Sequence, residues 1–316
     1  MSTALTELLG VKHPIIMAPM FLVSNSKMLI AGINNGIAAA VPALNYRTDE
    51  EFRAAIDEVR ANTNGVGLGV NLIVNKSNPK APAQLKTCVE KKVDFIITSL
   101  GSPEEVIKQC KPHGIKVFCD VVDLKFALKV QELGADAIIA VNSKAGGHAG
   151  PMTPEELIPL LAEKCDIPVI SAGGVGKASQ MEDVLKLGAV GASIGSVFIA
   201  SEESGVSNEY KQACVDYGAK DIVMSTKVSG TPCTVINTPY VQKIGTKQNW
   251  FERVLSKSKR LKKWVKMLTF VKGMKALEKS AFSATYKTVW CAGPTIEHTN
   301  SIKPVSEIIK GLTGEQ

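Results

Sequence analysis

The residue with the clearest potential for chemistry is His148, which lies in the glycine-rich segment GGHAG at residues 146–150. Glycines leave little neighbouring bulk, so this imidazole can be presented to a cavity. Near neutral pH it can accept a proton or donate a hydrogen bond to a substrate oxygen. The alternative is a loop histidine that only contacts solvent. We favour a functional role because the segment follows a predicted strand.

Two further glycine-containing segments are candidates for binding a phosphate. The first is AGGVG at residues 172–176, and the second is the pair Gly195-Ser196. Glycines let backbone N–H groups approach phosphate oxygens closely, and helices that begin after such turns favour anions. Glycines can also serve only to form tight turns. The two segments follow consecutive predicted strands, and this pairing favours a shared phosphate site.

The elements that must position these residues are short apolar runs alternating with longer amphipathic ones. Predicted strands cover residues 15–20, 37–41, 67–72, 95–98, 116–120, 137–141, 169–172 and 192–195. Predicted helices cover residues 27–34, 49–61, 83–91, 103–111, 124–133, 154–163 and 178–187. Thr48, Ser102 and Thr153 are candidate N-caps for three of these helices.

Strict alternation of strand and helix predicts a parallel sheet covered by helices. Eight regularly spaced repeats favour a closed (β/α)8 TIM barrel, and an open doubly wound sheet is the alternative. In such a barrel the active site lies where strands end and helices begin. His148 would then follow strand six, and the two phosphate candidates would follow strands seven and eight.

The alternation breaks after residue 205. Residues 201–207 are polar, residues 208–217 predict a helix, residues 226–245 are rich in Thr, Pro and Gly, and residues 305–312 predict a last helix. We therefore predict three parts: barrel strands and helices over 1–205, a C-terminal helical lid insertion over 206–290, and a segment over 291–316 that completes the barrel.

The net charge of +7 is localised. Residues 253–279 hold ten Lys or Arg and one acid, Glu278, so the rest of the chain carries a net −2. This distribution argues against nucleic-acid binding. Residues 250–279 fit a lid helix packed on the barrel, with steering of an anionic ligand as a second interpretation and a membrane surface as the least favoured one.

Other sequence features narrow the class of protein. No apolar run is long enough to span a membrane, and the N-terminus lacks a basic start followed by an apolar run, so we expect a cytoplasmic enzyme. The seven cysteines are scattered without a CxxC pair, and no cluster has metal-ligand spacing. We therefore expect neither disulfides nor a metal. His13, His113 and His298 lack the glycine frame of His148.

Polar residues at the predicted strand ends are candidates for binding the edge of a ligand ring. These residues are Asn71, Thr98, Ser99, Asp120 and Asn142. Asn71 is the strongest of them because it lies between apolar neighbours.

Five segments together resemble the nitronate monooxygenase (2-nitropropane dioxygenase) family, whose relatives include NADH:quinone reductases and the FMN-type enoyl-ACP reductase. These are IMAPM at 16–20, GVNL at 69–72, GGHAG at 146–150, ISAGG at 170–174 and IGSVF at 194–198. The resemblance covers about residues 5–205. Ala292-Gly293 resembles another family segment that approaches the flavin.

The resemblance implies FMN over the barrel mouth. It assigns the cofactor site to Ala18, Pro19, Met20, Asn71, Ala172, Gly173, Gly174, Gly195, Ser196, Ala292 and Gly293. The phosphate would lie on the last two strand-end loops, the 18–20 segment would run beside the isoalloxazine, and Asn71 would bind its edge. His148 matches the catalytic histidine. Asp120 departs from the pattern, because relatives often have a basic or hydroxyl residue there.

The activity implied is oxidation of alkyl nitronates or nitroalkanes with O2. The alternatives are an NAD(P)H-dependent reductase of quinones or enoyl thioesters, and a non-catalytic FMN-binding protein. The expected partners are a small-molecule substrate and O2 or another electron acceptor. The use of NAD(P)H and a homodimeric state stay open.

Overall fold

The computed structural model describes residues 2–63, 65–75, 78–226, 232–247 and 289–315. The basic segment at residues 250–279 lies outside the described residues. The lid, steering and membrane interpretations of this segment therefore stay predictions. Among the helices that are described, none is long and apolar enough to cross a membrane.

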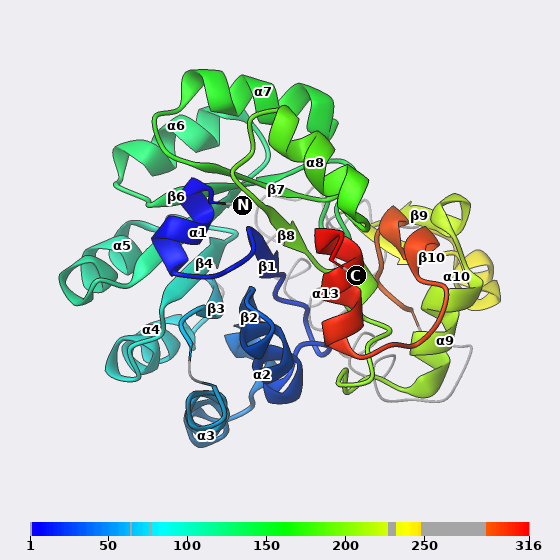
Figure 1. The fold of residues 1–316 in the computed structure, drawn as a ribbon, viewed down its shortest axis with the longest axis horizontal. Coiled ribbons are helices and arrows are strands. Elements are labelled where there is room, and N and C mark those ends of the chain that lie inside the picture. Colours follow the sequence, from blue (N-terminus) through cyan, green and yellow to red (C-terminus); the bar gives the residue numbers. More distant parts are fainter. Residues whose placement is uncertain (1, 64, 76–77, 227–231, 248–288, 316) are drawn as a thin grey trace, which may run out of the picture.

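Eight parallel strands form a closed barrel (Figure 1). They are β1 (Ile15–Met17), β2 (Ala38–Pro42), β3 (Leu68–Ile73), β4 (Phe95–Ser99), β5 (Lys116–Val121), β6 (Ala137–Val141), β7 (Val169–Ala172) and β8 (Ala192–Ile194). Ile16 pairs with Ala38 on one side and with Ser193 on the other, which closes the ring. The barrel prediction is confirmed over the open sheet. β1 ends three residues earlier than expected, so 18–20 become a loop.

Helices follow the strands around the barrel. They are α2 (Ser26–Asn34), α3 (Asp49–Ala61), α4 (Ala81–Glu90), α5 (Glu104–Cys110), α6 (Leu124–Glu132), α7 (Pro154–Lys164) and α8 (Ala178–Lys186). Thr48 and Thr153 form capping boxes as expected. The cap predicted at Ser102 lies one residue before the assigned N-cap, Pro103, and α5 begins at Glu104. The Ser102 Oγ still accepts the Glu104 N–H, at a long 3.5 Å.

The core has two layers because strand side chains alternate between the barrel interior and the surrounding helices. Phe95 and Phe118 fill the interior with ring centroids 5.3 Å apart. The N-terminal helix α1 (Ala4–Leu9), which the strand pattern did not predict, adds Leu5 and Leu9 to this inner cluster. Its apolar side therefore covers one end of the barrel interior.

After β8 the chain leaves the repeating pattern. A short 3-10 turn at Ser196–Phe198 leads to α9 (Asn208–Asp216), then to β9 (Ile222–Ser225), β10 (Cys233–Ile236) and α10 (Pro239–Ile244). β9 and β10 pair antiparallel. This hairpin was not predicted. The last helix, α13 (Val305–Thr313), packs against α2 and α8 (Figure 1), the position that a helix following β8 would occupy.

Candidate active site

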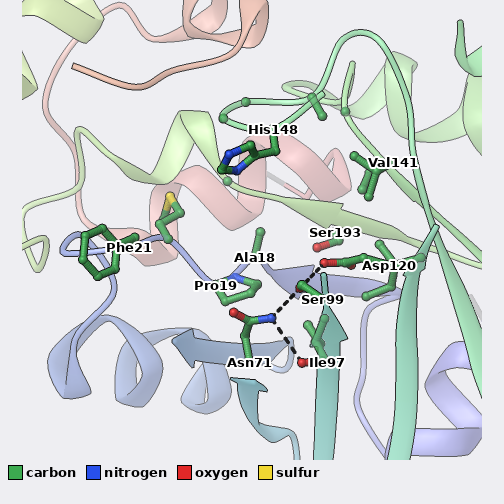
Figure 2. A pocket seen from close by; sticks show the side chains of 18 of the residues that line it. Ala18, Pro19, Phe21, Asn71, Ile97, Ser99, Asp120, Val141, His148 and Ser193 are labelled. Carbon is green, nitrogen blue, oxygen red and sulfur yellow. Dashed lines mark hydrogen bonds between the residues drawn. The ribbon is translucent and has the colours of Figure 1, made fainter. Parts of the chain in front are cut away.

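A cavity of about 740 Å³ lies at the carboxyl ends of the barrel strands (Figure 2). The structure brings together at this cavity nearly all of the residues singled out from the sequence. Those that line it are Ala18, Pro19, Met20, Asn71, Thr98, Ser99, Asp120, His148, Ala172, Gly173, Gly174, Gly195, Ser196 and Ala292. Gly293 and Asn142 are not among the lining residues, and neither are His13, His113 and His298.

His148 is held at the cavity by a hydrogen-bonded clamp from outside the barrel. The Gly147 N–H donates to the Thr234 Oγ1 over 2.8 Å, and the Thr234 N–H donates to the Gly147 carbonyl over 2.7 Å. The Thr234 hydroxyl also donates to the Ala145 carbonyl over 3.2 Å. Gly147 has φ of 76°, a left-handed conformation that glycine adopts without strain. Strand β10 therefore fixes the loop that carries His148.

The environment of His148 favours its neutral form. Its side chain is accessible from within the cavity, but protein surrounds the cavity, and this burial lowers the pKa of His148 below its ordinary value. A lowered pKa leaves the imidazole unprotonated at neutral pH, ready to accept a proton. In Figure 2, His148 and Asn71 lie on opposite sides of the pocket, with Pro19 between them.

The hydrogen bonds of Thr234 predict that replacing this residue lowers both stability and turnover. In Thr234→Val the Gly147 N–H loses its side-chain acceptor, which should lower the free energy of unfolding by about 1–3 kcal/mol. Turnover should fall as well, because the His148 loop is no longer held. Thr234→Ser keeps the hydroxyl and is the matched control. Denaturant unfolding and steady-state kinetics of both variants check this, and equal behaviour of the two would contradict it.

The glycine loops after β7 and β8 offer backbone donors to the cavity. Gly173 and Gly174 have φ of 113° and 83°. Within the described part of the chain, the N–H groups of Gly174, Val175 and Ser196 donate to no protein acceptor, and all three residues line the cavity. A Cβ on Gly173 would lie 2.4 Å from the Ala145 nitrogen. This cradle of free N–H groups suits the phosphate of a nucleotide cofactor.

Ser196 is positioned by the C-terminal segment. The Gly293 N–H donates to the Ser196 Oγ over 2.8 Å, and a Cβ on Gly146 would lie 2.6 Å from that oxygen. Gly293, expected beside the cofactor, therefore lies behind Ser196 and joins the His148 loop to the β8 loop. The Ser196 hydroxyl keeps its proton for another acceptor.

Ala292 reaches the cavity because the residues before it are anchored. The Tyr210 hydroxyl of α9 donates to the Cys291 carbonyl over 2.5 Å, and the Tyr210 ring stacks on Trp290 with centroids 5.6 Å apart. Tyr210 and Thr234 are functional supports that sequence reasoning missed. Nothing in their local sequence marks them, since each acts on a segment more than 80 residues away.

Asn71, Ser99 and Asp120 form a hydrogen-bonded chain that we call the polar row (Figure 2). The Asn71 amide nitrogen donates to the Ile97 carbonyl over 3.1 Å and to the Ser99 Oγ over 2.8 Å. The Ser99 hydroxyl donates in turn to the Asp120 Oδ2 over 2.5 Å. The Ile97 carbonyl can only accept, so the amide orientation of Asn71 is fixed and its Oδ1 remains as an acceptor for a ligand.

Burial raises the pKa of Asp120 to about 6, although the hydrogen bond from Ser99 works in the opposite direction by stabilising the carboxylate. The carboxyl group therefore changes its protonation state close to neutral pH. This raised pKa was not evident from the sequence, where Asp120 stood out as a polar residue at a strand end and as a departure from the family pattern.

Asn142, another strand-end candidate, is structural. It is fully buried, its amide nitrogen donates to the Gly173 carbonyl over 3.0 Å, and its Oδ1 accepts the Lys144 N–H over 2.9 Å. Asn142 therefore ties the His148 loop to the glycine loop of β7 instead of facing a ligand.

Several known proteins are similar to this chain. The family model described as nitronate monooxygenase matches residues 2–315. A dehydrogenase of Rhodococcus jostii, named for an octahydro-indene-carboxyl-CoA substrate, is 33% identical over 242 residues, covering 77% of this chain and 67% of that protein. A nitronate monooxygenase of Paraburkholderia phytofirmans is 29% identical over 275 residues, covering 72% of this chain and 74% of that one.

Among solved structures, FabK of Thermotoga maritima superposes with a TM-score of 0.86 at 28% identity, covering 100% of this chain and 96% of that one. The barrel, the glycine-framed histidine and the glycine loops thus occur together in a chain that the family model matches almost end to end. The chain belongs to the nitronate monooxygenase family and is an oxidoreductase.

Proposed function

We propose that this chain binds FMN at the barrel mouth and oxidises alkyl nitronates or nitroalkanes with O2. The observation that carries the proposal is the placement of His148. Its loop is held by Thr234 at a cavity also lined by the β7 and β8 loop residues whose N–H groups have no protein acceptor among the described residues. The family is flavin-dependent in general.

The residues present fit this cofactor. Gly174, Val175 and Ser196 would hold the phosphate through their N–H groups, with Gly195 beside them and the tight packing at Gly173 keeping its loop in place. Asn71 would accept a hydrogen bond from the ring edge, and Ala18, Pro19 and Met20 would form an apolar wall. When bound, FMN supplies the capacity to take electrons from the substrate and pass them to an acceptor.

His148 supplies the proton chemistry. In its neutral form it accepts the acidic C–H proton of a nitroalkane, and with an already deprotonated nitronate it can instead donate a hydrogen bond to the nitro oxygens. The cavity walls would hold the substrate against the cofactor site. Residues 206–290 would act as a lid insertion over this site, and residues 291–316 would complete the barrel.

A second candidate function is an NAD(P)H-dependent reductase of quinones or enoyl thioesters. It is favoured by the CoA thioester in the name of the Rhodococcus jostii relative. Anaerobic mixing separates the two. Rapid flavin bleaching by NADH or NADPH supports the reductase, whereas bleaching by alkyl nitronates alone supports the oxidase.

The cofactor proposal has its own test. We expect the purified full-length chain to carry non-covalent FMN at about one per chain, because one cradle of N–H groups accepts one phosphate. Absorbance after release of the flavin by denaturation, together with chromatographic identification, measures this. A colourless protein, or FAD as the sole bound flavin, would overturn the proposal.

A further inference from the structure

The polar row presents two unused oxygens to the cavity. In the described part of the chain no donor contacts the Oδ1 of Asn71 or the Oδ1 of Asp120, and both residues line the cavity. The remaining polar atoms of the row are used internally. Asn71 donates its amide hydrogens to Ile97 and Ser99, and Ser99 donates its hydroxyl hydrogen to Asp120. A ligand at the row therefore meets one fixed acceptor and one carboxyl group.

No cation pairs with Asp120 within the described residues. The adjacent strands contribute Thr98 and Ser99 from β4 and the apolar Ile139 and Val141 from β6, while β5 itself adds the buried thiol of Cys119. The cavity also contains Lys129, Lys144 and His148. Lys144 pairs with Glu155 over 3.0 Å, and none of these three groups contributes to the pKa shift of Asp120. Among the described residues, burial and the hydrogen bond from Ser99 are the causes of the pKa shift of Asp120.

We propose that Asp120 binds the edge of the cofactor ring as a neutral carboxylic acid, donating to a ring carbonyl, beside Asn71, which accepts the ring imide N–H. This inference rests on the proposed binding of FMN. It assigns a role to a position where the family resemblance gives a basic or hydroxyl residue. Such residues always offer a donor, whereas an aspartate offers one only when it is protonated.

The hydrogen-bonding pattern of the ring edge explains why the neutral form is required. An isoalloxazine edge carries carbonyl acceptors on either side of an imide N–H donor. The Asn71 Oδ1 satisfies the N–H, and a carbonyl next to it needs a donor. A carboxylate would place a negative charge against that carbonyl without any hydrogen to donate, which is costly at a buried group such as Asp120. A protonated Asp120 supplies the missing donor.

FMN binding should therefore take up a proton above pH 6. The pKa of Asp120 is about 6 before binding and rises further when the ring stabilises the neutral form. Its contribution to affinity is fully present below pH 6 and is lost as the pH rises through the pKa of the bound state. At pH 8 about one site in a hundred is neutral beforehand, so affinity should fall by up to roughly a hundredfold between pH 6 and pH 8.

Dilution of the holoenzyme tests this, with released FMN measured by its fluorescence at several pH values between 5.5 and 8. Wild type is compared with Asp120→Asn, whose amide donates at every pH, and with Asp183→Asn, the same change at an exposed position of α8. The FMN phosphate itself titrates near pH 6. The ratio of wild-type to Asp120→Asn dissociation constants cancels that contribution. This ratio should rise with pH, while Asp183→Asn should follow wild type.

Ser99→Ala should shift the pH dependence of FMN affinity in a predictable direction. Removing the hydroxyl that stabilises the carboxylate raises the pKa of Asp120 further, so the loss of affinity should move to higher pH. A purely structural role of Asp120 would not produce this shift. Tight FMN binding with a pH-independent ratio would overturn the inference alone. Absence of FMN from the wild type at every pH would overturn the proposed function instead.

Discussion

His148→Ala is expected to retain FMN and to lose turnover of a neutral nitroalkane by roughly a hundredfold or more, the usual scale for removing a general base. The cavity offers His148 as a neutral imidazole, because burial lowers its pKa. Loss of this group leaves the C–H proton without an acceptor. Steady-state kinetics with a nitroalkane, together with the flavin absorbance of the purified variant, measure the two expectations.

A preformed nitronate anion is the matched substrate, since no proton has to be removed from it. The defect of His148→Ala should be much smaller with this substrate than with the neutral one. His113→Ala, at an exposed position away from the cavity, should behave as wild type. Equal losses on the neutral and anionic substrates would contradict a role as base.

The same pKa shift gives a pH dependence. Neutral imidazole is the active form, so the rate with a neutral nitroalkane should stay level at neutral pH and fall as the pH drops through the pKa of His148, below its ordinary value of 6.5. The acid limb should disappear in His148→Ala. A rate that rises on acidification would contradict this assignment.

Gly174→Val is expected to weaken FMN binding by at least about tenfold, or about 1.4 kcal/mol. Gly174 has φ of 83°, which costs a β-branched residue about 1–2 kcal/mol. It lines the cavity, and its N–H has no protein acceptor among the described residues. The new side chain would also meet the Lys144 side chain, 3.1 Å from the Cβ position. The FMN content of the purified variant and its dissociation constant give the measurement.

Gly218→Val is the control, because a Cβ there meets nothing within 4 Å and its φ is negative. It should keep wild-type FMN affinity. Gly173→Val is a poorer probe, since its Cβ would lie 2.4 Å from both the Ala145 nitrogen and the Asn142 Oδ1 and would disturb the whole loop. Wild-type affinity in Gly174→Val would rule out the N–H cradle as the phosphate site.

The strand positions could be predicted from the sequence because a parallel barrel buries both faces of each strand. Such strands appear as short apolar runs between amphipathic helices. Seven of the eight strands were predicted with ends within one residue of those observed, as for residues 95–98 and β4. The 15–20 run was too long because residues 18–20, although apolar, leave the ladder to line the cavity.

The C-terminal third was less predictable. Strand β10 lies in a stretch rich in Thr, Pro and Gly, and its partner β9 lies after residue 205, where the alternation of strand and helix has ended. Neither strand therefore has a periodic signal. A two-stranded hairpin of this kind is stabilised mainly by what it packs against. Here it pairs with the His148 loop through Thr234 and with Cys291 through Val235.

The sequence by itself determined the barrel, the glycine-framed histidine and the glycine loops, because these depend on residue types at local spacing. Only the tertiary structure decided what holds and tunes them. Thr234 fixes the His148 loop, Gly293 fixes Ser196, and the polar row places Asp120 where burial raises its pKa to about 6. Each of these effects depends on how close segments far apart in the chain lie and on how far they exclude solvent. Local sequence patterns do not contain this information.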